Sequence, residues 1–381
     1  MGRVLFAVVM VGALAGCVTV QTPAGPVASR PSVTSSTSPS VATSVPPVVG
    51  PSAATVVASP TPGAVVATLN AAANGTGSIV YIKAGDVWLA SPDGSDARQL
   101  TTDGARSGYH DPTQAADGTI LALQGPSTLV ALDRSSGAQI RPPVTLPVLE
   151  NGAEGLVVSP DAAHISYTTT GFGKTVDPRF GTPNGAFIYG GTDVATPDGR
   201  SLPNAAVAGA IFPEWVDATT LVMSDGTRLY LDPVGGQPSV WLDLSNGCLT
   251  DVGCPADQGP AANLTDPAIS ADDRVISAVY KPYYGDGGRL VGRLDASPPS
   301  DPASTCVLPG QENFSDPGSF APGDSAFAYD DTSFDPNTLT STAGQGIHVL
   351  ELDLGANDCG ASSSQLVIAG GAQPEWGPLA P

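Results

Sequence analysis

The chain has 381 residues and a formal net charge of −21 at pH 7, because 36 acidic side chains outnumber 15 basic ones. Its lysines, Lys83, Lys174 and Lys281, make no basic patch that neutralises phosphates, so nucleic acid is not expected as a partner. The high content of 45 glycines and 37 prolines favours many tight turns over long helices.

The N-terminus has the pattern of an export signal. Arg3 precedes an apolar core from Val4 to Leu14, which is shorter than the roughly 20 residues of a membrane-spanning helix. The quartet Leu14-Ala15-Gly16-Cys17 resembles the bacterial lipobox, in which the cysteine thiol is diacylated and the preceding bond is cut. The resemblance implies a lipoprotein signal peptide over residues 1–16 and acyl chains such as palmitate on Cys17. An ordinary signal peptide with a chance cysteine is the alternative.

Residues 17–77 differ in composition from the rest of the chain. They are rich in Pro, Ser, Thr, Val and Ala, and Arg30 is the only charged residue between Cys17 and Lys83. Such a segment buries too little apolar surface to offset the entropy of ordering, and its prolines keep it extended. We therefore predict a disordered tether that holds the rest of the protein away from the membrane, with the lipid as the anchor on the extracytoplasmic side.

Residues 78–381 contain many short apolar runs. Each run is as long as a strand, is enriched in β-branched and aromatic residues, and is bounded by Gly, Pro, Asp or Ser. No stretch has the pattern of a convincing amphipathic helix, so the sequence predicts an all-β domain. Examples of these runs are "SIVYI", "DVWLA", "TILAL", "TLVALD", "AFIYG", "RLYLD", "RVISAVY", "SAFAYD" and "QLVIAG".

The predicted strands recur as a repeat with a period of about 50 residues. Each repeat begins with a short apolar strand, passes through a turn containing Pro and Asp, and enters a second strand. The clearest copies are "VVSPDAAHISYTT" (157–169), "FPEWVDATTLVMS" (212–224), "DPAISADDRVISA" (266–278) and "DPGSFAPGDSAFAY" (316–329), and "PEW" occurs at 213–215 and 374–376.

These repeats resemble the TolB-type, WD-like propeller family of bacterial proteins, whose blades carry a "PxWSPDGxxIAF" segment followed by a "GxxxIYVxxxDG" hairpin. The resemblance covers about residues 78–379 and implies six four-stranded blades around a channel. Insertions at 171–184 and 331–345 interrupt the repeat, so a count of seven blades is the alternative. The segment 371–378 is a first strand with no blade after it, and Ser78 starts a blade that lacks its first strand. The resemblance implies that the two segments share one blade and close the ring.

Four further cysteines follow Cys17. An even number in an exported chain favours two disulfides, although four cysteines permit three pairings. We predict that Cys248 pairs with Cys254 across a short loop and that Cys306 pairs with Cys359 between neighbouring blades. Metal ligation is the alternative, but the sequence has neither a CxxC pair nor a histidine near these cysteines.

The sequence contains no recognisable catalytic motif. It has three histidines, without HExxH or HxH spacing, and no GxSxG segment for a serine nucleophile. We therefore do not expect an enzyme. Its many carboxylates leave a glycan hydrolase or lyase as a third possibility, because sequence does not give the separation of two acids.

Acidic residues recur near the start of the predicted innermost strands. If these strands line the channel, the acids gather at one mouth and form a site for Ca²⁺ or a basic peptide. The plain alternative is that each acid beside a proline forms the turn that enters its blade. The candidates are His110, Asp111, Glu154, Glu214, Asp266, Asp316 and Glu375.

The loop "YDDTSFDPN" (329–337) is a second, weaker calcium candidate, with Asp330, Asp331 and Asp335 as the ligands. We expect no other cofactor. By analogy with TolB-type propellers, the resemblance implies a monomeric interaction module that binds an envelope protein or a basic peptide. A solute- or carbohydrate-binding propeller is the runner-up.

Overall fold

A computed structural model describes part of the chain. It covers residues 76–172, 188–244, 263–270, 275–281, 288–293, 305–308, 318–323, 325–331, 333–335, 340–342, 344–355, 358–361, 364–378 and 381. The chain divides into the units 1–67 and 68–381, and every described residue lies in the second. Cys17 and the predicted tether therefore lie outside the described residues. Within them, no helix combines the length and the apolar character that a membrane crossing requires.

The first part of the described chain forms short strands and a single turn of helix. These elements are β1 (Ser78–Lys83), β2 (Asp86–Ala90), β3 (Arg98–Gln99), α1 (Gly104–Ser107), β4 (Tyr109–Gln114), β5 (Ile120–Gln124), β6 (Thr128–Leu132), β7 (Val144–Thr145), β8 (Ala153–Val158), β9 (Ile165–Phe172), β10 (Ile188–Ala195), β11 (Val207–Ala208), β12 (Ile211–Trp215), β13 (Thr220–Ser224), β14 (Arg228–Pro233) and β15 (Ser239–Asp243).

The second part continues with strands. They are β16 (Asn263–Ile269), β17 (Val275–Lys281), β18 (Gly288–Arg293), β19 (Thr305–Leu308), β20 (Ser319–Phe320), β21 (Ala326–Asp330), β22 (Ser333–Asp335), β23 (Thr340–Thr342), β24 (Gly346–Gly355), β25 (Asp358–Ala361), β26 (Gln365–Ala369) and β27 (Ala372–Gly377).

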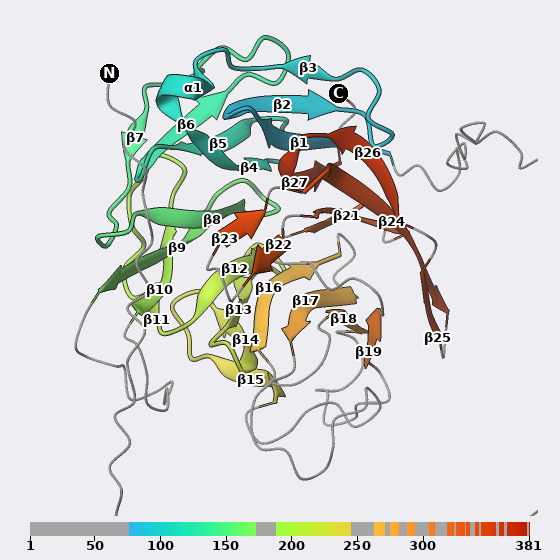
Figure 1. The fold of residues 1–381 in the computed structure, drawn as a ribbon. Helices are drawn as coiled ribbons and strands as arrows, with labels where there is room; N and C mark the ends of the chain where they lie inside the picture. Colours follow the sequence, from blue (N-terminus) through green and yellow to red (C-terminus); the bar gives the residue numbers. More distant parts are fainter. Residues whose placement is uncertain are drawn as a thin grey trace, which may run out of the picture. The chain divides into compact units, whose positions relative to one another are not determined.

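Consecutive strands pair into antiparallel sheets. Within the described residues, the strand orders are β27-β1-β2-β3, β4-β5-β6-β7, β8-β9-β10-β11, β12-β13-β14-β15, β16-β17-β18-β19 and β20-β21-β24 with β25 and β26 on β24, and β22 pairs with β23 alone. The sheets are arranged radially (Figure 1). This arrangement confirms the predicted all-β propeller fold.

The first strand of each sheet lies nearest the centre, and we call β27, β4, β8, β12, β16 and β20 the inner strands. Each inner strand contacts the inner strands of both neighbouring sheets: β27 contacts β4, β4 contacts β8, and the series continues through β20 back to β27. Strands from opposite ends of the described chain share one sheet, because β1 pairs with β27 and Ile79 lies opposite Trp376.

The hydrophobic core lies between the sheets. Successive residues of a strand point to opposite faces, so a strand packed on both sides is apolar throughout. In β1, Ile79 and Tyr81 pack toward the sheet of β20–β26, whereas Val80 packs toward the sheet of β4–β7. A separate cluster of buried apolar side chains fills the space between each pair of neighbouring sheets among the described residues.

The sheet that contains β24 departs from the predicted four-stranded pattern. β24 has 10 residues, and its two halves have different partners. Its first half pairs with β21 and β26, with His348 opposite Leu366. Its second half extends beyond them and pairs with β25, with Leu354 opposite Cys359.

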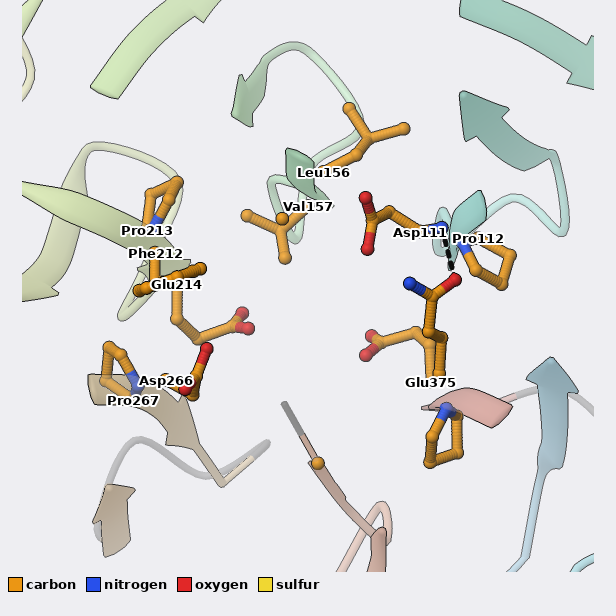
Figure 2. Close-up of a pocket in the computed structure, with 14 residues that line it drawn as sticks. Asp111, Pro112, Leu156, Val157, Phe212, Pro213, Glu214, Asp266, Pro267 and Glu375 are labelled. Atoms are coloured by element: carbon orange, nitrogen blue, oxygen red, sulfur yellow. Dashed lines mark hydrogen bonds between the residues drawn. The ribbon is translucent and has the colours of Figure 1, made fainter. Parts of the chain in front are cut away.

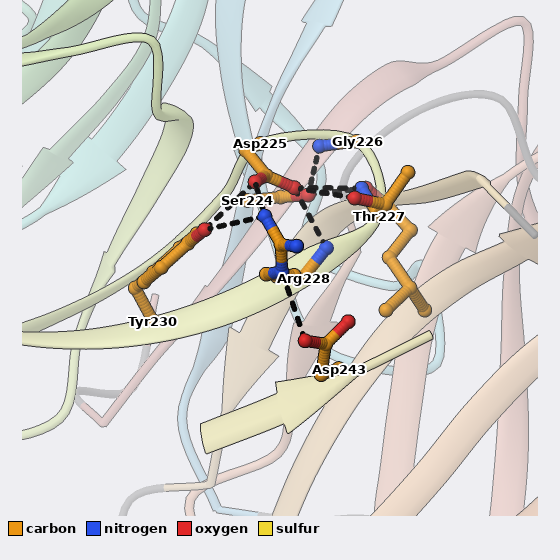
Figure 3. Close-up of polar contacts among 8 residues, drawn as sticks. Ser224, Asp225, Gly226, Thr227, Arg228, Tyr230 and Asp243 are labelled. Carbon is orange, nitrogen blue, oxygen red and sulfur yellow. Dashed lines mark hydrogen bonds and ion pairs between the residues drawn. The ribbon is translucent and has the colours of Figure 1, made fainter. Parts of the chain in front are cut away.

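A polar cluster fixes the turn between β13 and β14 (Figure 3). The Oδ1 atom of Asp225 accepts hydrogen bonds from the backbone N–H groups of Thr227 and Arg228 at 2.8 and 2.7 Å. Its Oδ2 atom accepts the Tyr230 hydroxyl at 2.8 Å. Gly226, in the same turn, accepts the Leu264 N–H at 2.8 Å and so connects the turn to β16 of the next sheet.

Candidate functional site

Five of the inner strands carry a similar bulge near the centre of the propeller. The pairing register shifts in β4, β8, β12, β16 and β27. In each bulge one residue has a positive φ, and a proline follows it in four of the five. Bulges bend a strand and re-aim its side chains, and proline fits there because it has no N–H for the ladder. The residues with positive φ are Asp111 (45°), Gly155 (61°), Phe212 (53°), Asp266 (47°) and Gln373 (52°).

The bulges surround a cavity of about 50 Å³, which we call the central cavity (Figure 2). One water molecule needs roughly 10–15 Å³ by the same measure, so the cavity has room for a few waters or for the end of one side chain. None of its described lining residues carries a positive charge. They are Asp111, Pro112, Gly155, Leu156, Val157, Phe212, Pro213, Glu214, Asp266, Pro267, Gly318, Gln373, Pro374 and Glu375.

Glu214 and Glu375 extend into the central cavity from β12 and β27, with their carboxylates directed toward its centre (Figure 2). Both residues are partly buried, and the accompanying desolvation disfavours their charged forms. Burial and then the charge of Glu375 raise the pKa of Glu214 well above its ordinary value. Burial raises the pKa of Glu375 to about 7, against a smaller lowering by a hydrogen bond from Ser319. The pair therefore holds at least one proton near neutral pH.

Asp266 is a third acid in the same cavity, and its side chain is buried. Burial, with smaller contributions from the charges of Glu154 and Asp111, raises the pKa of Asp266 to about 6. A hydrogen bond from Thr265 and the charge of Arg289 act in the opposite direction. The central cavity thus combines three acids with raised pKa values, and none of its described lining residues is positively charged.

His110 lies beside the cavity and faces an acceptor with each ring nitrogen. Its Nδ1 atom is 2.8 Å from Asp111 Oδ2, and its Nε2 atom is 2.8 Å from the Gly125 carbonyl oxygen. An imidazole donates to two acceptors at once only when it is protonated. Burial lowers the pKa of His110, but the bonds to Asp111 and Gly125 and the charge of Glu154 outweigh it and raise the pKa overall.

The structure brings four of the predicted acids to one cavity, namely Asp111, Glu214, Asp266 and Glu375. His110 contacts Asp111, and Glu154 interacts with both through its charge. Asp316 lies outside the described residues. The acids occupy different positions of the repeat, because Asp111 and Asp266 are bulge residues, whereas Glu214 and Glu375 come two positions later.

Sequence reasoning missed Gln373, which shares the bulge position with Asp111. The Gln373 side-chain oxygen accepts a hydrogen bond from the Asp111 backbone N–H at 3.0 Å, and the backbone N–H of Gln373 donates to Asp330 Oδ2 at 2.9 Å. Phe212 has the same place in β12, where its N–H donates to the Thr168 hydroxyl at 2.7 Å. Phe212 and Gln373, like Asp111 and Asp266, immediately precede a proline, and this position was the signal in the sequence that could have identified them.

The weaker calcium candidates have protein partners. Asp330 is buried and accepts the Gln373 N–H. Asp331 accepts the Gly346 N–H at 2.9 Å and faces His348. The Asp335 side chain is outside the described part of the structure, within which no three His, Cys, Asp or Glu residues are arranged to hold a metal ion. Calcium binding stays a prediction.

The predicted disulfides lie on segments that are described in part. Cys248 and Cys254 lie outside the described residues, and so do the side chains of Cys306 and Cys359. The strands that carry the second pair, β19 and β25, contact each other across neighbouring sheets. This contact is compatible with the predicted bridge, which stays a prediction.

No protein-family model and no curated protein matches the sequence. Solved structures match the fold. TolB from Acinetobacter baumannii is similar with a TM-score of 0.52 at 13% identity, over 80% of this chain and 67% of that one.

Two further structures are similar at lower scores. A putative TolB from Agrobacterium tumefaciens has a TM-score of 0.45 at 13% identity, over 78% of this chain and 91% of that one. An oligogalacturonate lyase from Vibrio parahaemolyticus has a TM-score of 0.44 at 13% identity, over 72% of this chain and 70% of that one. The radial sheets and the similarity to the Acinetobacter protein together show that this chain has a TolB-like β-propeller fold.

Proposed function

We propose that this protein is a lipid-anchored interaction module on the extracytoplasmic side of a cell membrane, and that it receives a cationic segment of an envelope protein at the central cavity. The observation that carries the proposal is the convergence of Glu214, Asp266 and Glu375 in a cavity whose described lining is free of positive charge. A lysine or arginine side chain inserted there supplies the missing counter-charge.

The raised pKa values support this chemistry. A buried carboxyl group that lacks a counter-charge holds its proton, whereas a nearby cation favours the ionised form. Binding of a basic side chain is therefore coupled to proton release from Glu375, whose pKa is about 7 in the free protein. We expect affinity for a cationic ligand to increase as the pH rises from 6 to 8.

We further propose that the propeller has six blades and that the β1–β27 pairing closes it. In support, each of the six radial sheets contributes one inner strand, and a hydrophobic cluster separates each neighbouring pair of sheets in the described part. A closed ring with one carboxylate-lined cavity at its axis presents a single site, which suits a monomer.

The anchor is a proposal from sequence alone. Cys17 becomes the lipidated first residue of the mature protein, and residues 18–77 serve as the tether. The acidic domain is repelled by anionic lipid headgroups, so the lipid supplies the membrane attachment and leaves the propeller free to meet a protein partner.

The cavity favours this function over carbohydrate binding or glycan cleavage. A volume of about 50 Å³ suits the end of a side chain and is small for an oligosaccharide. Three of the four tryptophans, Trp215, Trp241 and Trp376, are buried in the core, where they offer no stacking surface to a sugar ring.

Calorimetry with a tetra-arginine peptide at pH 8 tests the proposed cavity site. We expect the double variant Glu214→Gln/Glu375→Gln to weaken binding at least tenfold. Asp198→Asn, which changes an exposed carboxylate in the turn after β10, is expected to leave affinity within twofold. A tetra-glutamate peptide controls for unspecific association, and a calcium titration tests the alternative ligand. Equal affinity of the double variant and the wild type would exclude the cavity as the site.

Crosslinking in intact cells tests the role of the module. Recovery of one envelope protein through a basic segment supports the proposal when the double variant no longer recovers it. Turnover of a glycan in the absence of any captured protein would favour a hydrolase or lyase instead.

A further inference from the structure

A serine, a histidine and an aspartate lie in contact on the sheet of β20–β26, and this group is separate from the central cavity. Tyr329 in β21 and His348 in β24 are directly opposite each other in the strand register, so their side chains share a face. Their rings stack with centroids 5.6 Å apart. Ser364 immediately precedes β26, whose first residue, Gln365, pairs with Val349.

Polar contacts connect these side chains in one continuous series. Tyr329 Oη is 2.6 Å from Ser364 Oγ, and Ser364 Oγ is 3.1 Å from His348 Nδ1. On the other side of the ring, His348 Nε2 is 3.3 Å from Asp331 Oδ2. His348 Nε2 makes no hydrogen bond in this structure, so the contact is an ion pair when His348 is protonated; catalytic contacts in unliganded sites are often longer than in the substrate complex.

The contacts are consistent with a single direction of proton donation. The Tyr329 hydroxyl donates to Ser364 Oγ, the Ser364 hydroxyl donates to Nδ1 of a neutral His348, and the Nε2–H of His348 faces the Asp331 carboxylate. In this order His348 accepts the proton of Ser364, and the Asp331 carboxylate favours the His348 tautomer that carries its proton on Nε2. The mirror order would leave His348 Nε2 without a proton opposite an anion.

Asp331 is fixed in position as the orienting acid. Its Oδ1 atom accepts the Gly346 N–H at 2.9 Å. Burial raises the pKa of Asp331, but hydrogen bonds from the N–H groups of Gly346 and Gln345 lower it by more, so the pKa is below its ordinary value and the group is ionised at neutral pH.

The group is partly exposed to solvent. The side chains of His348 and Asp331 are 17% and 23% exposed, and Ser364 is half-buried. Tyr329, by contrast, is buried at the interface with the sheet of β16–β19. The serine therefore lies on the more exposed side of the group, and the tyrosine lies on its buried side.

From this geometry we infer that Ser364, His348 and Asp331 form a nucleophile, base and orienting acid that hydrolyse small carboxylic esters, with Tyr329 as a hydrogen-bond donor to the reacting oxygens. The inference is independent of cation binding at the central cavity. It differs from the expectation of a purely binding protein. That expectation relied on the absence of a GxSxG motif, which marks one local arrangement of a serine nucleophile, whereas these residues come from separate segments of the sheet.

The proposed reaction proceeds through an acyl-serine. Ser364 Oγ attacks the ester carbonyl carbon as its proton passes to His348 Nδ1, and Tyr329 donates a hydrogen bond to the developing charge. The carbon–oxygen bond to the alcohol breaks, and the alcohol leaves with the proton from Nδ1. Water then gives a proton to Nδ1 and attacks the acyl carbon, which releases the carboxylic acid and restores Ser364 with its proton.

Covalent labelling of the full chain tests the nucleophile directly. A biotinylated fluorophosphonate forms a bond from phosphorus to Ser364 Oγ with loss of fluoride, and the labelled residue is assigned by mass spectrometry of the peptide. We expect label on Ser364 in the folded wild-type protein. Absence of label on Ser364 in protein with a cooperative melting transition would overturn the inference, and this result needs no variant.

Hydrolysis of p-nitrophenyl acetate tests the roles of the partners. Ser364→Ala is expected to reduce the rate to that of buffer. His348→Phe retains a ring to stack on Tyr329 but removes the base, and we expect it to lower the labelling rate by about 10²–10⁴-fold. Ser239→Ala, in the exposed outer strand β15, is the matched serine control and should leave both rates unchanged. Equal labelling of wild-type and Ser364→Ala protein would contradict the assignment.

Discussion

Individual carboxyl groups in this protein differ in chemistry because of their surroundings. Glu375 in the central cavity has a pKa raised to about 7 by burial. Asp133, in the exposed turn after β6, has a pKa lowered to about 2, because Ser135 and Ser136 donate hydrogen bonds to its charged form. Near neutral pH the Glu375 carboxyl group is therefore partly protonated, whereas the Asp133 carboxyl group is ionised.

Replacement of Glu375 by Gln should reduce the pH dependence of stability. A carboxyl group whose pKa is raised by folding stabilises the native state while protonated, and this contribution is lost as the pH rises from about 4 through the folded value near 7. Above pH 7 the variant avoids a buried charge, so we expect it to exceed the wild type by about 1–2 kcal/mol in free energy of unfolding. Urea unfolding at pH 5 and pH 8 measures the effect.

A matched carboxylate outside the cavity serves as the comparison. Glu150 lies exposed in the loop before β8, and Glu150→Gln should retain the wild-type difference between the two pH values. If Glu375→Gln also retains that difference, the assignment of the titration to the cavity is wrong.

At the scale of elements, a single side chain organises the β13–β14 turn. Asp225 is 2% exposed at its side chain and accepts from two backbone N–H groups, the Thr227 hydroxyl and the Tyr230 hydroxyl. Asp243 meets the same Arg228 from the more exposed side, where 43% of its side chain is accessible. The two acids therefore share a partner but differ in burial and in the number of bonds they accept.

Asp225→Ala should cost about 2–3 kcal/mol, because it leaves several donors unsatisfied in a buried turn. Asp243→Ala removes a partly solvated ion pair and should cost about 0–1 kcal/mol. Thermal and urea unfolding of the two variants measure the difference. Equal losses would show that the Arg228 ion pair, and not the turn, is the stabilising feature.

The elements themselves were largely predictable, and their irregularities were not. "SIVYI" and "DVWLA" have the composition and length of strands, and they form β1 and β2. The bulges escaped prediction because a positive φ at Phe212 or Gln373 depends on tertiary contacts that override the usual preference of L-residues. The acids near proline indicated the cavity, but the Ser364–His348 contact arises between residues of different strands that no local pattern connects.

The contact of β19 with β25 gives an element-scale test of the second predicted disulfide. Peptide mapping of non-reduced protein should find Cys306 linked to Cys359 if the contact between their strands brings the two Cα atoms within the short separation that a disulfide needs. Reduction should then lower the free energy of unfolding by about 2–4 kcal/mol. Recovery of both cysteines as free thiols from protein secreted by its native route would reject the bridge.

At the scale of the whole molecule, the pairing of β1 with β27 forms a junction between strands that lie far apart in the chain. Gln114 in β4 connects this junction to the next sheet, because its Nε2 atom donates to the carbonyl oxygens of Ser78 and Glu375, each at 3.0 Å. Its Oε1 atom accepts from Ser78 Oγ and from Arg134. One buried side chain thus binds both β1 and β27, which come from opposite ends of the described chain.

Gln114→Leu should open this junction before the rest of the propeller unfolds. Leucine has a similar size but makes none of these bonds, so two carbonyl groups lose their partner and stability should fall by about 2–4 kcal/mol. Hydrogen exchange measured by mass spectrometry should then become faster in β1 and β27 and stay unchanged in β13, on a different sheet. Uniform acceleration in all strands would mean that the ring unfolds as one cooperative unit. Unchanged exchange in β27 would mean that strand pairing and the apolar contacts of Ile79 and Trp376 hold the ends together without Gln114.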